Sequence, residues 1–134
     1  MRRSGVAVAA AAVLIAEGAA LGVVSLLELF ALTAGGAASA PAGVALVVLT
    51  LVGAAALVAF GIGVLRGVSW GRSGGILFQV LAIALALSSL SLDPVSWAFT
   101  LSVGIAGVAG FVLLILTARR EGAADARTRT RDED

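Results

Sequence analysis

Four long apolar runs, separated by short polar or small-residue stretches, constrain the fold of this chain more than any other feature. They cover about residues 5–32, 43–65, 74–92 and 96–118 of the 134 residues. Each is about twenty residues long or longer, the length that an α-helix rising 1.5 Å per residue needs to cross about 30 Å of hydrocarbon. The sequence therefore predicts an all-α membrane protein whose residues 1–118 form a bundle of four transmembrane helices.

The connections between these runs are too short to hold an extramembrane domain. They read TAGGAASAPA at 33–42, RGVSWGRS at 66–73 and SSLSLDPV at 88–95. Glycine, proline and serine in such stretches are turn signals. The end of the chain, residues 119–134, reads RREGAADARTRTRDED. This segment is charged and lacks apolar periodicity, so we expect a disordered cytoplasmic tail.

The arginines predict how the chain is oriented in the membrane. All nine basic residues are Arg, and they lie before the first run, between the second and third, and after the fourth, at Arg2, Arg3, Arg66, Arg72, Arg119, Arg120, Arg127, Arg129 and Arg131. The other two connections carry no basic residue. Because cytoplasmic loops are enriched in Lys and Arg, we expect an up-down-up-down bundle in the cytoplasmic membrane with both termini inside. Trp70 and Trp97 then lie near opposite interfaces, where tryptophan acts as an anchor.

The composition argues against enzyme activity. The chain has no Cys and no His, which excludes thiol catalysis, disulfides, and metal sites built from thiolate or imidazole. It contains none of the phosphate-binding, zinc-protease or serine-hydrolase motifs. We therefore expect no catalytic residues, no cofactor and no metal. The net charge of +1 follows the topology, so the expected partners are the lipid bilayer and a larger membrane complex or a second copy, not nucleic acid.

Two glutamates inside the first apolar run are the strongest functional clue. A charged side chain at a helix centre costs about 2.5–3.5 kcal/mol on insertion scales, so it usually faces a partner, a cavity or a path. Glu17 and Glu28 are 11 positions apart, which at 100° per residue places both on one helix face, roughly 16 Å apart. Two acids at two depths fit a proton or cation path. Glu28, however, lies near the outer end of the run and can extend toward the headgroups.

Glu17 falls near the middle of the membrane, where no other charge is available to neutralise it. We expect a neutral Glu17 that points into the bundle and is hydrogen-bonded by a polar side chain of another helix. The candidates are Thr50, Ser88 and Gln79. Gln79 is the only amide of the third run, and the commonest role of such a residue is a hydrogen bond between helices. Arg66 and Arg72 are also within potential reach of Gln79. Packing and function both remain open for Glu17.

Small residues recur at helical spacing in two of the runs. Gly18 and Gly22 form a G-x-x-x-G pair in the first, and Gly104, Gly107 and Gly110 recur every three residues in the fourth. Such positions allow helix backbones to approach closely. They predict tight packing, either within the chain or between copies.

The segment RGVSWGRSGGILFQ at 66–79 resembles a signature of small four-span integral membrane proteins of actinobacteria. In that family an R-G-x-x-W-x-R-S run joins the second and third helices and a Gln follows. The matching residues are Arg66, Gly67, Trp70, Arg72, Ser73 and Gln79. Val68, Ser69 and Gly74 depart from the residues that family members often carry. No biochemical activity is assigned to the family, so the resemblance implies the four-span topology and no mechanism.

Two functions follow from these observations. The first is a non-enzymatic accessory or scaffold component of the membrane, which fits the short loops and the lack of catalytic groups. The alternative is a proton-coupled transporter or channel that acts as a homo-oligomer through Glu17. The position of Glu17 resembles that of the essential acid in the first helix of small multidrug resistance transporters. The middle of these helices, however, has no Tyr or Trp to line a drug site.

Overall fold

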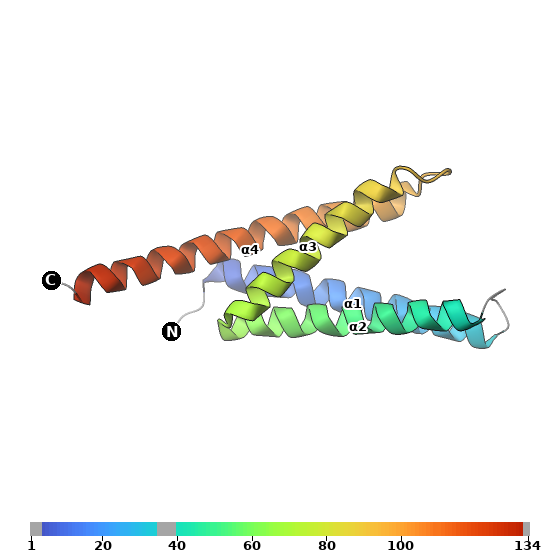
Figure 1. Cartoon of the computed structure of the whole chain (residues 1–134), viewed down its shortest axis with the longest axis horizontal. Coiled ribbons are helices and arrows are strands. Elements are labelled where there is room, and N and C mark those ends of the chain that lie inside the picture. The colour runs from blue at the N-terminus through green and yellow to red at the C-terminus, as the bar shows by residue number, and fades with distance from the viewer. Residues whose placement is uncertain (1–3, 35–39, 133–134) are drawn as a thin grey trace.

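The computed structural model shows four α-helices (Figure 1) and describes residues 4–34 and 40–132. The helices are α1 (Gly5–Thr33), α2 (Ala40–Arg66), α3 (Ser69–Ser89) and α4 (Trp97–Asp132). All four are long and apolar enough to cross a membrane. The predicted all-α fold with four membrane-spanning helices is therefore confirmed. The predicted turn glycines Gly35 and Gly36 and the arginines Arg2 and Arg3 lie outside the described residues.

The ends of α1 and α2 follow from local chemistry. The Ser4 side chain accepts a hydrogen bond from the Ala7 amide and caps the start of α1, which satisfies a backbone donor that the first helical turn leaves unpaired. At the same end of the α1–α2 pair, Gly67 follows α2 with a φ of +72°. The Gly67 and Val68 amides donate to the carbonyls of Val64 and Gly63. This is a Schellman ending, in which glycine adopts the left-handed conformation most easily.

The connection between α2 and α3 is shorter than the predicted 66–73 loop. Only Gly67 and Val68 separate the helices, and α3 begins at Ser69. The chain can turn this tightly because Gly63 and Gly71 touch: a Cβ atom on Gly71 would lie 2.7 Å from the Gly63 carbonyl carbon. Trp70, Arg72 and Ser73 are therefore residues of the first turns of α3, not of a loop.

The fourth helix differs from the prediction at its end. The apolar run stops near Ala118, but α4 continues to Asp132, so the described part of the expected disordered tail is helical. Ala, Arg and Glu have high helix propensity and dominate the first residues of this extension. Once the membrane-spanning part has formed the helix nucleus, each added residue costs little.

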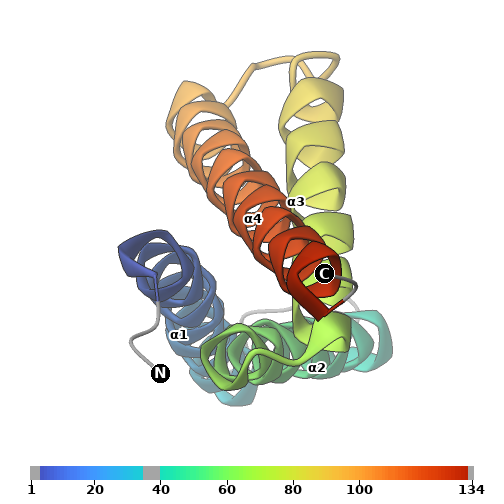
Figure 2. The same ribbon diagram turned by 90° about the vertical axis from the view of Figure 1, so that its left-hand side faces the viewer.

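The four helices form two antiparallel hairpins, α1 with α2 and α3 with α4. The start of α1, the α2–α3 turn and the end of α4 lie toward one end of the molecule (Figures 1 and 2). The hairpins meet at this end and diverge toward their own connecting turns (Figure 1). The buried core lies where they meet and comprises Ala7, Ala10, Ala11, Leu14, Leu57, Val64 and Leu114. Small alanines on α1 let α2 approach closely, which explains the compact α1–α2 pair.

Large apolar side chains cover the outer faces of all four helices. Phe30, Leu49, Leu77 and Ile105 are each exposed by two thirds or more (71%, 69%, 67% and 67%). Water would make such a surface unfavourable, whereas lipid tails solvate it. The chain is thus a small multi-pass integral membrane protein.

Candidate functional site

Glu17 and Gln79 meet where the two hairpins pack together. The Gln79 Nε2 atom donates to Glu17 Oε2 at 2.6 Å, joining α3 to α1. Gln79 is fully buried, whereas Glu17 is half-buried. Of the three predicted neighbours of Glu17, the structure thus selects Gln79, and the expectation that this amide bonds across helices is confirmed. Thr50 instead donates to the Leu46 carbonyl of its own helix.

Gly110 of α4 makes room for the Gln79 side chain. A Cβ atom on Gly110 would lie 2.5 Å from Nε2 and 2.6 Å from Cδ of Gln79, closer than atoms in contact allow. The amide therefore lies against the bare backbone of α4 on one side and bonds to α1. Its Oε1 atom is buried and has no hydrogen-bond partner among the described residues. One acceptor in the middle of the bundle is thus left unsatisfied.

Glu17 also lines a hollow between α1 and α4 with a volume of about 410 Å³. The lining residues are Val13, Ala16 and Glu17 from α1, and Leu101, Ser102, Ile105, Ala106 and Ala109 from α4. Apart from the Glu17 carboxyl and the Ser102 hydroxyl, the lining is apolar. The Ser102 hydroxyl donates to the Ala98 carbonyl at 2.7 Å. We call this hollow the α1–α4 groove.

Glu28 lies outside the α1–α4 groove, in a hollow between α1 and α2. It is exposed and lines a hollow of about 250 Å³ with residues of α1 and α2, among them Leu32, Gly43 and Val47. The two hollows share no lining residue. The two carboxyls therefore do not line one continuous path in this structure, although they stand on the same helix.

The chain matches no protein-family model, no curated protein and no solved structure.

The residues of the 66–73 signature build the junction of α2 and α3. Arg66 ends α2 and is exposed, and Gly67 makes the turn. The Trp70 ring packs edge-on against Phe60 of α2, with centroids 5.8 Å apart, while half of its surface remains exposed (51%). Ser73 donates to the Ser69 carbonyl in the same helix. Each of these contacts is local and structural.

Arg72 pairs with Glu121, so it does not bond to Gln79. The ion pair joins its Nη1 atom to Glu121 Oε2 and ties the start of α3 to α4 just beyond the apolar part of that helix. The side chains are 20% and 38% exposed. Arg72 thus contacts the part of α4 that was expected to be disordered.

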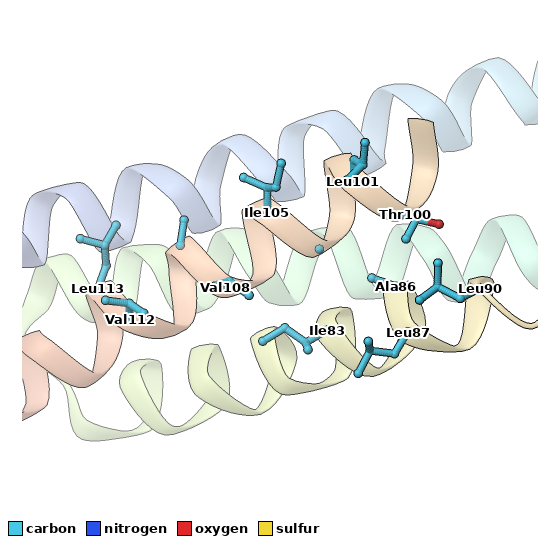
Figure 3. Close-up of a pocket in the computed structure, with 12 residues that line it drawn as sticks. Ile83, Ala86, Leu87, Leu90, Thr100, Leu101, Ile105, Val108, Val112 and Leu113 are labelled. Atoms are coloured by element: carbon cyan, nitrogen blue, oxygen red, sulfur yellow. The ribbon is translucent and has the colours of Figure 1, made fainter. Parts of the chain in front are cut away.

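A larger hollow, of about 760 Å³, lies between α3 and α4 (Figure 3). Ile83 and Leu87 of α3 line it together with Val108 and Val112 of α4. Thr100 is the only hydroxyl residue in the lining, and it shares a 2.6 Å hydrogen bond with Ser89 near the α3–α4 turn. This surface offers no charged or catalytic group. The described residues also contain no cluster of acidic side chains suited to a metal.

Three site residues were missed from the sequence alone. Ser102 and Glu121 belong to no motif. Gly110 was recognised as a packing position, but its contact with Gln79 was not predicted. Helical spacing could have placed Gly110 and Ser102 on neighbouring faces of α4. The contact of Gly110 with Gln79 depends on how α3 and α4 are rotated against each other within their hairpin, for which the sequence holds no local signal.

Proposed function

We propose that this chain is a non-enzymatic accessory or scaffold component of the cytoplasmic membrane. The observation that carries the proposal is the engagement of Glu17 by Gln79 within the chain. A mid-membrane acid held by an interhelical amide joins two hairpins, which is a structural task. The short connections leave the exposed helix faces as the main surface through which a partner would bind.

The proposed orientation places both termini in the cytoplasm. It is supported by the start of α1, the α2–α3 turn and the end of α4, which lie toward one end of the molecule (Figure 1). Arg66 and Arg72 are at that turn, and Arg119 and Arg120 follow the apolar part of α4. Such a grouping is what the positive-inside rule associates with the cytoplasmic side. The likeness to the four-span actinobacterial family points to the same arrangement.

Purification from native membranes tests the accessory role. A tagged chain, solubilised in mild detergent at its natural expression level, should recover a larger membrane protein in a fixed ratio. A tagged Phe30→Ala variant tests the exposed face of α1, because it removes a large exposed side chain without touching the core. Recovery of the partner should fall if the partner binds this face. Recovery of the chain with no other membrane protein would count against an accessory role.

A second function is favoured by one observation: Glu17 is only half-buried and lines the α1–α4 groove. We infer from this that proton-coupled transport by a homo-oligomer is the competing function, with Glu17 exchanging protons and substrate. Reconstituted liposomes with an imposed proton gradient would be compared for the parent chain and Glu17→Gln. Flux that is lost in Glu17→Gln would favour transport. Equal flux in both, at the level of empty liposomes, would exclude it for the substrates tried.

A further inference from the structure

The two walls of the α1–α4 groove carry polar groups that can form hydrogen bonds with each other when two copies face one another. The Glu17 carboxyl lies on its α1 wall and the Ser102 hydroxyl on its α4 wall. The small side chains of Ala16, Ala106 and Ala109 also line the groove. Only one carboxyl oxygen of Glu17, Oε2, is hydrogen-bonded within the described part of the chain, to Gln79. The other is left for a group outside the monomer.

We propose that the α1–α4 groove is the docking surface for a second copy of this chain, in a two-fold dimer in which each Glu17 meets the Ser102 of the other copy. In a two-fold interface the same patch faces itself, so residue pairs occur twice. A protonated Glu17 accepts the Gln79 amide at Oε2 and donates from its other oxygen to the partner's Ser102 hydroxyl. That hydroxyl already donates to its own helix at Ala98 and keeps its lone pairs for this bond.

The depth of the two groups suits this symmetry. Two copies that insert in the same orientation are related by an axis along the membrane normal, so facing residues must lie at equal depth. Glu17 and Ser102 line one hollow, which places them at about the same level although they belong to different helices. Small residues at Ala16, Ala106 and Ala109 allow the close backbone approach that stabilises helix pairs in lipid.

No cationic side chain of a second copy can pair with Glu17 inside the membrane. All nine basic residues of the sequence are Arg outside the four apolar runs, so a second copy offers Glu17 a hydroxyl, not a counter-charge. This matches a neutral acid at the interface, whose burial costs far less than that of a carboxylate. The inference stands apart from the accessory role, because a dimer can either carry a partner or act alone.

Cysteine cross-linking tests the proposal directly, since the chain has no native Cys. Two copies with tags of different size are co-expressed, one with Ala16→Cys and the other with Ala106→Cys, and oxidised in the membrane with copper–phenanthroline. The control pair is Ala55→Cys with Ala84→Cys, which exchanges exposed alanines of α2 and α3 outside the groove. We expect the cross-tag product from the groove pair and only background from the control pair.

A second measurement does not depend on cysteine chemistry. Energy transfer between labelled copies in liposomes, followed as lipid is added, reports the dimer constant. Ser102→Ala should weaken the dimer about tenfold, an effect in the range of an interhelical hydrogen bond in lipid. Thr50→Val is the matched control, because Thr50 also donates only to its own helix but lies outside the groove.

Three results would overturn the proposal. Equal cross-linking of groove and control pairs would indicate random collision. No cross-tag product and no energy transfer would mean that lipid covers the groove. In native membranes, a product between Ala16→Cys and a different protein, without the cross-tag product, would show that another partner takes the groove.

Discussion

Gln79 donates to the Glu17 carboxyl at 2.6 Å, although the two residues are 62 positions apart. The bond joins α1 of one hairpin to α3 of the other. Interhelical hydrogen bonds in membranes are worth about 0.6 kcal/mol on average and up to about 1.7 kcal/mol. The value here should lie toward the upper end, because Gln79 is fully buried and water cannot replace its partner.

A double-mutant cycle tests this bond. We expect Glu17→Ala and Gln79→Ala together to show a coupling energy of about 1–1.7 kcal/mol in the free energy of unfolding, measured by steric trapping in bicelles. Glu17→Gln should keep most of the coupling with Gln79, because its amide carbonyl still accepts the bond. Additive single effects would show that the two side chains do not interact.

Gly110→Ala should destabilise the bundle by about 1–3 kcal/mol, the usual cost of overpacking. The added Cβ would lie 2.5 Å from Nε2 of Gln79 and would push the amide away from Glu17. Gly104→Ala is the matched control on the same helix, since its Cβ would meet only the Ala86 Cβ atom at an ordinary 3.4 Å. The free energy of unfolding of both variants is the measurement. Equal losses would contradict the tight contact at Gly110.

The two glycines of the G-x-x-x-G pair should behave differently. A Cβ on Gly18 would lie 2.7 Å from the Ala54 carbonyl oxygen of α2, whereas a Cβ on Gly22 would meet nothing within 4 Å. We expect Gly18→Ala to cost about 1–3 kcal/mol. Gly22→Ala should instead stabilise α1 by up to about 1 kcal/mol, because alanine favours helix over glycine. Thermal denaturation in detergent would rank the two, and a larger loss at Gly22 would contradict the packing of α1 on α2.

The existence of the four helices could be predicted because each apolar run is long and clearly bounded. The α3 start was placed too late, at about Gly74 instead of Ser69, because a polar, glycine-containing stretch has the composition of a loop. Gly67 and Val68 are enough to make the turn. The end of α4 was placed too early because hydropathy falls at Ala118. Helix propensity acts independently of hydropathy, and α4 continues to Asp132.

The site could be predicted only in part. A mid-membrane acid must find a polar partner, and that rule reduced the candidates for Glu17 to three residues. Choosing Gln79 requires the rotation of α3 and the crossing of the hairpins, which arise from many weak contacts. Helical spacing put Glu17 and Glu28 on one face of α1, but the two residues lie beside different neighbouring helices. Glu17 lies beside α4, and Glu28 beside α2.

The Arg72–Glu121 ion pair should hold the first turn of α4 beyond the apolar run. Arg72→Gln is expected to speed amide hydrogen exchange at residues 121–124, with a local loss of about 0.2–1 kcal/mol, as is usual for partly exposed ion pairs. The effect should shrink at high salt, which screens such pairs. Arg119→Gln is the control, because Arg119 is exposed. Exchange that is unchanged in Arg72→Gln would show that the helix continues without this contact.

The proposed orientation leads to a test with reporter fusions. Alkaline phosphatase folds only outside the cytoplasm, whereas green fluorescent protein fluoresces inside. With both termini in the cytoplasm, fusions after Val68 and at the C-terminus should fluoresce and lack phosphatase activity. A fusion after Leu92, between α3 and α4, should show the reverse. Because loop arginines set orientation, replacing Arg66 and Arg72 by Gln while adding two Arg beside Leu92 should reduce this contrast. Phosphatase activity at Val68 in the parent chain would overturn the orientation.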